Sequence, residues 1–456
     1  MGLKTKVTGA LVSNWFREIS LIDAENIPSD RGSIIVSWHP GGMFDELLTK
    51  NLLPINLISV DVNSIDEQKL MEIAQMVSSG GSVVVFPEGV SHDLPKSIEI
   101  KDTAAKIAIK AAEICTGKKP VIIALGIHYS NKNMFRERVA VTVERPIEIE
   151  GDVEHLSMII SGEISRASQS QDNWKDRELI WKARSIVKAE RQRMSKISNQ
   201  KPTYGEDILG ARRVRAAWEW LAMNNEKECQ RLERKTREHM AMLESYNLRP
   251  YDVDSRPMSV TNLGFAKSIF LWLYAWSFML GFVTLSALIG SLPPFLFVVF
   301  SDKYLWSNLD QSSRSKFKLY SVFISYPIWW VISATGFTWA LLSSDSPLAG
   351  LADYSVTIEF LFSLPSFAVF PIMLWWMPTS AKLQVALYSR GTKSWKRMRL
   401  WMKWRSSKFD WSSISESQQN LAKELVNIGD KLVLPGDEDW VEPLPGKDDI
   451  SVIQQR

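Results

Sequence analysis

Cysteine is scarce in this chain, and its scarcity narrows the chemistry to be considered. Cys115 and Cys229 are the two cysteines among 456 residues, and no Cys-x-x-Cys pair is present. Disulfide frameworks and zinc sites need more closely spaced ligands, and the five histidines fall in no His/Cys/carboxylate pattern either. We therefore predict no disulfide framework and no metal site, and expect both cysteines to be packed thiols of helices in a reducing compartment.

A leader segment and a nucleic-acid-binding pattern are also missing. The first thirty residues have no continuous apolar run, so no cleavable leader is expected. The helical region from Trp174 to Leu248 has many arginines, but acidic residues alternate with them from Glu226 to Glu244, and no aromatic–basic repeat of an RNA-binding module is present. With a net charge of only +3, this pattern indicates a solvated helical arm, and we expect no nucleic-acid partner.

The chain does have two β-branched runs that end in clusters of chemically useful residues. The first, SIIVSWHPGGMFD, covers residues 33–45, and the second, VVVFPEGVSHD, covers residues 83–93. Open α/β sheets bind ligands at the carboxyl ends of their strands, so a shared site is expected there. A Pro-Gly-Gly turn can bring Asp45 back to His39 and fix the tautomer of a general base. For His39 taken alone, the alternative is an ordinary loop histidine.

Several ordered motifs resemble those of one enzyme family. HPGGMFD and FPEGVSHD resemble the first and third motifs of the glycerolipid acyltransferase superfamily, whose glycerophosphate members have H-x5-D where the lysophosphatidate enzymes have H-x4-D. NIPSDRGSIIVSWHP, KDTAAKIAIKA and PVIIALGIHYSNKNMFRERVAVTVERPIEI follow the family pattern in order. ARRVRAAWEW and ESYNLRPYDV resemble the glycerol-3-phosphate/dihydroxyacetone-phosphate acyltransferase branch, so the resemblance covers roughly residues 15–253.

The resemblance implies both a fold and a reaction. The fold is an α/β acyltransferase domain, a mixed sheet flanked by helices, with a helical extension. The reaction moves a fatty acyl group from a thioester donor, either acyl-CoA or acyl-carrier protein, to a hydroxyl of glycerol 3-phosphate in phospholipid biosynthesis, without a cofactor. In it, His39 removes the hydroxyl proton and Asp45 holds the imidazole. Glu88 and Gly89 shape the acceptor pocket, and Glu88 accepts hydrogen bonds from glycerol hydroxyls.

The acceptor phosphate has five candidate ligands, which are Ser91, His92, Lys101, Arg136 and Arg138. An arginine pair beside a strand end can grip a phosphate bidentately. These candidates matter because the family's second motif, which ends in a phosphate-holding arginine, should lie near residues 55–64, where INLISVDVNS has no arginine. This departure puts phosphate recognition by that element in doubt.

Three alternatives stay open at this point. The acceptor can be dihydroxyacetone phosphate or a lysophospholipid instead of glycerol 3-phosphate. The chain can also be a degenerate acyltransferase that serves as a membrane scaffold, which the missing arginine allows and the retained His39 and Asp45 oppose. The third alternative is a membrane-bound thioesterase, which would use the same base to activate water.

Beyond residue 265 the composition becomes apolar. Residues 268–300, 320–342 and 356–377 are each long enough to cross a bilayer, which takes ~20 apolar residues. Lysine and arginine mark cytoplasmic segments: residues 344–354 have none, residues 301–318 have four, and residues 382–408 have nine. We therefore expect an integral membrane protein with residues 301–318, the tail and the catalytic domain on the cytoplasmic face. Residues 268–300 must then form a hairpin, as two short spans or a re-entrant loop, that turns near residues 290–294.

These patterns divide the chain into four parts. They are the α/β catalytic domain (1–150), the helical extension (151–260), the transmembrane module (265–380), and a basic, aromatic segment with a flexible tail (381–456). In the last part Trp395, Trp401, Trp404 and Trp411 interleave with lysines and arginines, a combination that suits the headgroup layer of an anionic leaflet. The acidic end from Pro435 onward is expected to be flexible.

Near the N-terminus a stripe of apolar residues fits two structures equally. Leu11, Val12, Trp15, Phe16 and Ile19 recur at helical spacing. The stripe can belong to a helix packed on the catalytic sheet, or to an amphipathic helix that lies in the membrane interface.

Overall fold

The computed structural model describes residues 8–9, 12–13, 15–131, 137–195, 203–254, 261–309, 311–343, 360, 363–405 and 410–456. The chain forms two compact units, one from residues 1–254 with 412–456 and the other from residues 255–411. This grouping differs from the four predicted parts, because the C-terminal residues from 412 onward join the unit that contains the predicted catalytic domain.

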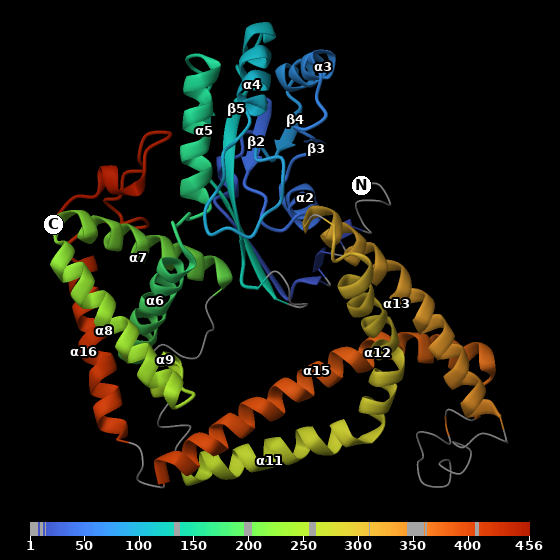
Figure 1. Ribbon diagram of the computed structural model, residues 1–456. Helices are drawn as coiled ribbons and strands as arrows, with labels where there is room; N and C mark the ends of the chain where they lie inside the picture. The colour runs from blue at the N-terminus through green and yellow to red at the C-terminus, as the bar shows by residue number, and fades with distance from the viewer. Residues whose placement is uncertain are drawn as a thin grey trace. The chain divides into compact units, whose positions relative to one another are not determined.

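The first unit is built on a seven-stranded sheet of mixed direction (Figure 1). Its strand order is β1-β6-β5-β2-β4-β3, with β7 paired to β5. The strands are β1 (Glu18–Ile22), β2 (Ser33–Ser37), β3 (Leu57–Val60), β4 (Ser82–Val85), β5 (Val121–Tyr129), β6 (Arg138–Val143) and β7 (Ile147–Glu148). Strands β3, β4, β2 and β5 are parallel, whereas β6 and β7 are antiparallel to β5. The predicted mixed sheet is confirmed, and the carboxyl ends of its parallel strands meet at one edge.

Helices cover both faces of this sheet, which explains its buried β-branched strands. Ile34 and Val36 of β2 pack into a cluster with residues of α3 (Glu67–Ser78), α4 (Thr103–Ile114) and α5 (Val153–Ala167). Ile35 points to the opposite face and packs into a second cluster with Leu48 of α2 (Met43–Leu52). The alternation follows from the two-residue period of a strand. The residues that follow each parallel strand lie at the carboxyl edge of the sheet.

The N-terminal stripe packs on the catalytic sheet. Val12 and Phe16 are buried in the second cluster, and Trp15 and Ile19 lie against it. Ile19 is itself a residue of β1, and Leu11 lies outside the described residues. The stripe therefore packs on the sheet, which is the first of the two arrangements that its spacing allowed.

The residues of the predicted helical extension form several helices. They include α6 (Trp174–Ser195), α7 (Tyr204–Asn224), α8 (Glu226–Ser245) and α9 (Pro250–Asp254), and α16 (Trp411–Gly429) packs with them. Thr203 and Glu206 form a reciprocal capping box at the start of α7. Lys235 of α8 pairs with Glu424 of α16 at 2.7 Å. The alternating charges on these helices thus form ion pairs within the extension.

The C-terminal end packs on α7 instead of being flexible. Leu432 and Leu434 are buried in a cluster with Ala216 of α7. Arg212 of α7 donates a hydrogen bond of 2.7 Å to Asp449 and another of 2.7 Å to Glu442. The expectation of a flexible end was wrong because the acidic residues of the tail are matched by arginines of α7.

The second unit contains long helices. They are α11 (Asn262–Phe278), a π-helical segment (Met279–Val283), α12 (Thr284–Phe300), a second π-helical segment (Ser301–Leu305), α13 (Gln311–Leu342) and α15 (Ser366–Arg405). Within the described residues, Asn262–Gly281 and Thr284–Leu305 are long and apolar enough to cross a membrane by length and composition. The predicted span 320–342 lies in α13, whereas the predicted span 356–377 falls partly outside the described residues.

The break in the first apolar run lies elsewhere than predicted. We expected a turn near residues 290–294, but α12 continues through Pro293 and Pro294. The residue with non-helical backbone is Gly281, at φ −87° and ψ −155°. Glycine leaves the helical region most readily because it has no Cβ, and prolines are tolerated in apolar helices when neighbouring helices satisfy the freed backbone groups. The predicted loop 344–354 lies outside the described residues.

The tryptophans predicted to lie in a headgroup layer belong largely to one helix. Trp395 and Trp401 lie in α15 and contact α11 within the second unit. The Trp401 ring stacks on Phe265 at 4.0 Å, and the Trp395 ring lies 5.9 Å from Trp272. These two side chains therefore pack between helices, and the side chain of Trp404 lies outside the described residues.

Candidate active site

Strand β2 delivers two aromatic residues to the carboxyl edge of the sheet. Trp38, which is 4% exposed, donates its indole N–H to the carbonyl of Ile127 in β5 at 3.1 Å. The Ser37 hydroxyl donates to the carbonyl of Leu125 in the same strand at 3.0 Å. These two bonds fix the end of β2 against β5, so that His39 leaves the sheet at a defined point.

The predicted pair of His39 and Asp45 is present. The Nδ1 atom of His39 lies 2.9 Å from Oδ2 of Asp45. Gly42 turns the chain with φ +61°, so that Asp45 falls in the first turn of α2 and faces back toward His39. The Gly41 N–H also donates to Oδ2 at 2.7 Å. This turn closes tightly, since a Cβ at Gly41 would lie 2.6 Å from Oδ1 of Asp45.

Tyr129 completes the set of hydrogen bonds to Asp45, and the sequence reasoning missed it. Its hydroxyl donates to Oδ1 of Asp45 at 2.5 Å. Burial, together with the nearby Asp45 charge, raises the pKa of Tyr129 well above its usual value, so its hydroxyl remains a donor. The available signal was its position, because Tyr129 ends β5, the strand that lies beside β2.

The remaining nitrogen of His39 is suited to accept a proton. Because the carboxylate of Asp45 can only accept, we assign the hydrogen to Nδ1, which leaves the Nε2 lone pair available. The imidazole stacks on Phe86 with ring centroids 4.3 Å apart, and the side chain is 15% exposed. The arrangement is a partly shielded imidazole with its tautomer set by a buried carboxylate, a geometry that suits a general base.

Glu88 is a structural brace in this site. Its Oε2 accepts the His39 N–H at 2.9 Å, and its Oε1 accepts the Ile98 N–H at 3.0 Å. The Nε2 atom of His92 lies 3.0 Å from Oε1 without hydrogen-bond geometry. We expected Glu88 to accept hydrogen bonds from substrate, but its carboxylate is fully buried and already joins the His39 turn to the following loop.

The Gly89 turn and the nearest phosphate candidates lie beside this brace. Gly89 has φ +69°, and its carbonyl accepts a hydrogen bond from the Asn63 amide at 2.7 Å. The His92 N–H donates to the carbonyl of His39 at 3.3 Å. Ser91, next to it, is half-buried. The loop that carries the third motif, FPEGVSHD, is therefore joined directly to the residue proposed as the base.

The cationic phosphate candidates are more scattered. Lys101 is exposed, and its ammonium donates to Asn63 at 2.5 Å. Arg138 donates to Asp207 of α7 at 3.1 Å, with its guanidinium 4.8 Å from the Tyr204 ring centroid. Arg136 lies outside the described residues. The structure thus brings together His39, Asp45, Glu88 and His92, while Arg138 is paired with the helical extension.

A further histidine near the strand ends, His128, has a strongly lowered pKa. His128 is buried in β5, and burial together with the charge of Arg177 lowers its pKa to about 3. It is therefore neutral at physiological pH. Among the described residues, no group of three or more His, Cys, Asp or Glu side chains is placed to hold a metal ion.

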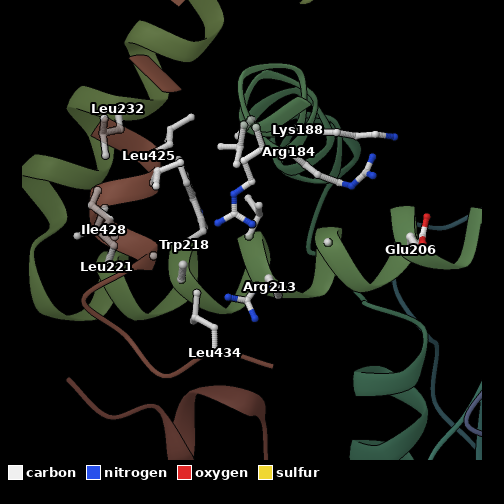
Figure 2. Close-up of a pocket in the computed structure, with 18 of the residues that line it drawn as sticks. Arg184, Lys188, Glu206, Arg213, Trp218, Leu221, Leu232, Leu425, Ile428 and Leu434 are labelled. Carbon is white, nitrogen blue, oxygen red and sulfur yellow. The ribbon is translucent and has the colours of Figure 1, made fainter. Parts of the chain in front are cut away.

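A separate hollow lies in the helical extension (Figure 2). It has a volume of about 430 Å³ and is lined by α6, α7, α8, α16 and Leu434. Figure 2 shows Trp218, Leu221, Leu232 and Leu425 on one side of it, and Arg213 at its edge. None of the predicted site residues that the structure describes lines this hollow.

With the sheet and the H-x5-D turn described, the chain can be compared with known proteins. A solved structure to which it is similar is that of the 1-acyl-sn-glycerophosphate (LPA) acyltransferase PlsC from Thermotoga maritima. The TM-score is 0.31 and the sequence identity 19%, and the alignment covers 36% of this chain and 78% of that chain. No family model matches the chain.

A closer match is found in sequence. Over 71 residues the chain is 37% identical to glycerol-3-phosphate O-acyltransferase 2 of Saccharomyces cerevisiae. These residues make up 16% of this chain, and the match spans 10% of the yeast protein's length. The predicted resemblance to the glycerolipid acyltransferase superfamily is thereby confirmed.

Proposed function

We propose that this chain is an O-acyltransferase that transfers a fatty acyl group from a thioester to a hydroxyl of glycerol 3-phosphate. The observation that carries the proposal is the bond of 2.9 Å between His39 and a fully buried Asp45 at the carboxyl edge of the sheet. The sequence match to a glycerol-3-phosphate O-acyltransferase supports the same reaction. Acyl-CoA or acyl-carrier protein serves as the co-substrate, and no cofactor takes part.

The reaction is a direct displacement. His39 Nε2 removes the proton of the acceptor hydroxyl while its oxygen attacks the thioester carbonyl carbon. The carbon–sulfur bond then breaks, and the leaving thiolate takes the proton from the imidazolium. Asp45 stabilises that imidazolium, and its bonds to Gly41 and Tyr129 hold it in place. No covalent enzyme intermediate is needed.

Glycerol 3-phosphate is favoured as the acceptor over the alternatives by the name of the yeast relative. The H-x5-D spacing of His39 and Asp45 agrees with this choice. Around the site, Gly89 shapes the acceptor pocket, and Ser91, His92, Lys101, Arg136 and Arg138 are the proposed phosphate ligands from sequence. Arg138 can reach a substrate only if its bond to Asp207 is shared or exchanged.

The second unit is proposed to attach the enzyme to a lipid bilayer. Its two apolar helical stretches, Asn262–Gly281 and Thr284–Leu305, support this role. The lysines and arginines of residues 301–318 and 382–408 support a cytoplasmic position for those segments, and we propose the same face for the catalytic domain. An enzyme held there meets a soluble acceptor and delivers an amphiphilic product, with one acyl chain and a charged phosphate, into the leaflet.

The test is a product assay in which labelled glycerol 3-phosphate and acyl-CoA are added to membranes that contain the full chain. We expect a labelled monoacylated glycerol phosphate. Release of free fatty acid alone would indicate a thioesterase, and the absence of both products would indicate a scaffold. His39→Ala should lower the rate about 10²–10⁴-fold, and Asp45→Asn nearly as much, because the base or its tautomer is lost. The exposed histidine variant His155→Ala is the matched control and should keep full activity.

A further inference from the structure

Arg177 of α6 lies next to the catalytic turn. Its guanidinium carbon is 5.6 Å from the ring centroid of Trp38, the residue that precedes His39, and 5.8 Å from the ring of Trp174. One of its nitrogens donates to the carbonyl of Pro95 at 3.3 Å. Arg177 thus joins the helical extension to both strand-end segments of the candidate site.

This guanidinium has no carboxylate partner among the residues that the structure describes. The neighbouring arginines differ, since Arg138 and Arg184 both pair with Asp207, and Arg215 pairs with Glu219 at 2.7 Å. Burial and the nearby Arg215 lower the pKa of Arg177, but an arginine starts so high that it stays charged at neutral pH. Even a half-buried charge without a counter-charge is costly. Such a site favours an anion as its missing partner.

Side-chain and backbone contacts link Arg177 to His39 through Trp38 and His92. The Trp38 ring, on which the guanidinium lies, meets the His92 ring edge-on at 6.2 Å. His92 in turn donates its backbone N–H to the carbonyl of His39. Arg177, Trp38 and His92 therefore contact one another in turn, while the Trp38 ring packs on one face of the sheet and the His39 ring stacks on Phe86 of the other face.

We propose that Arg177 binds the phosphate monoester of the acyl acceptor. Only one nitrogen of its guanidinium is used by Pro95, so the planar fork retains donors for two phosphate oxygens. The cation–π contact with Trp38 holds the fork in place before the ligand arrives. This inference rests on the proposed acyltransferase function, and it assigns the phosphate to a residue that the sequence motifs do not include.

The kinetic test compares Arg177→Gln and Arg177→Lys in the full chain. Arg177→Gln should raise KM for glycerol 3-phosphate about 10- to 100-fold and leave KM for acyl-CoA within about threefold, because a charged hydrogen bond to the acceptor alone is lost. The KM of Arg177→Lys for glycerol 3-phosphate should lie between those of the wild type and Arg177→Gln, because lysine keeps the charge and loses the planar guanidinium. Lys175→Gln, on the exposed part of the same helix, is the matched control and should change neither value. Equal increases in both KM values would overturn the proposal and assign Arg177 a purely structural role.

A binding measurement separates this proposal from the proposed reaction. Titration calorimetry with the His39→Ala protein should show binding of glycerol 3-phosphate, and binding of glycerol should be at least tenfold weaker. Adding Arg177→Gln should remove most of the difference between the two ligands. If the double variant still prefers the phosphorylated ligand to the same extent, Arg177 is not the phosphate ligand, even if acyl transfer is established. Thermal unfolding of each variant checks that a loss of binding does not reflect a loss of folding.

Discussion

At the residue scale, Asp45 is the most constrained side chain of the candidate site. Its carboxylate is fully buried and accepts hydrogen bonds from His39, Gly41 and Tyr129. A buried carboxylate needs several such donors, because it has given up its water shell. The donors also fix its direction, which in turn fixes the imidazole of His39. The geometry of the proposed catalytic pair therefore depends on Gly41 and Tyr129 as well.

The contribution of Tyr129 can be measured directly. Tyr129→Phe removes the 2.5 Å hydrogen bond to Asp45 and keeps the buried ring, so we expect kcat to fall about tenfold with little change in stability. Because the pKa of Tyr129 is raised well above its usual value, the loss should be the same at pH 6 and pH 9. Steady-state kinetics at both values check this, with Tyr251→Phe, an exposed tyrosine, as the control. A rate equal to wild type would show that Asp45 does not need this bond.

At the element scale, the turn between β2 and α2 positions the base. Gly41→Ala would place a Cβ 2.5 Å from the Tyr129 hydroxyl and 2.6 Å from Oδ1 of Asp45, so the two side chains must separate. We expect acyl transfer to fall about 100-fold, within the range for loss of a positioned base. Gly117→Ala meets nothing within 4 Å and should be active. Similar activities for the two variants would show that the turn tolerates a wider spacing.

Much of this element pattern could be predicted from the sequence. The strand before His39, the strand before Glu88 and the helix after Lys101 follow from β-branched runs and helical periodicity, which are local signals. The contact of Tyr129 with Asp45 could not, because 84 residues separate them and only the pairing of β5 with β2 brings them together. The position of the helix break at Gly281 was also missed, since Pro293 and Pro294 are the stronger breakers by local rules.

At the scale of the whole molecule, ion pairs distant in sequence shape the first unit. Arg212 and Asp449 are 237 residues apart, and no local pattern relates them. This is why an acidic, proline-containing end was predicted to be flexible and is instead packed. The helical extension therefore holds the C-terminal segment as well as supporting the sheet.

Glu163 makes the attachment of the C-terminal segment to the first unit sensitive to pH. Its carboxylate accepts the Gly446 N–H at 2.8 Å and an Arg166 N–H at 2.7 Å, and burial raises its pKa to about 7. The folded state therefore binds a proton more tightly than the unfolded state, and the stabilisation present below pH 4.5 is lost as the pH rises through 7. We expect the free energy of unfolding to fall over this range by at most about 3–4 kcal/mol, and the melting temperature to fall with it.

Glu163→Gln is the variant that checks this dependence. The amide cannot ionise, so the melting temperature should change less between pH 5 and pH 8 than it does in the wild type. Glu154→Gln, an exposed acid at the start of the same helix, should keep the wild-type slope. Equal slopes for all three proteins would show that Glu163 has the same proton affinity in both states.

The arrangement in the membrane is the largest-scale prediction, and the break at Gly281 changes one part of it. If Asn262–Gly281 and Thr284–Leu305 each cross the bilayer, the chain is back on the cytoplasmic face after Leu305, which puts Arg314, Lys316 and Lys318 on the side that the positive-inside bias favours. Residues 344–354, which have no lysine or arginine, then lie on the far side after one more crossing. After replacement of Cys115 and Cys229, single cysteines at Leu280, Ser307 and Ser346 can be probed in sealed vesicles with an impermeant thiol reagent. We expect Leu280→Cys and Ser346→Cys to react from one side and Ser307→Cys from the other. Labelling of Ser307→Cys and Ser346→Cys from the same side would contradict this topology. Labelling of Leu280→Cys from the same side as Ser307→Cys would mean that the first pair of helices re-enters without crossing.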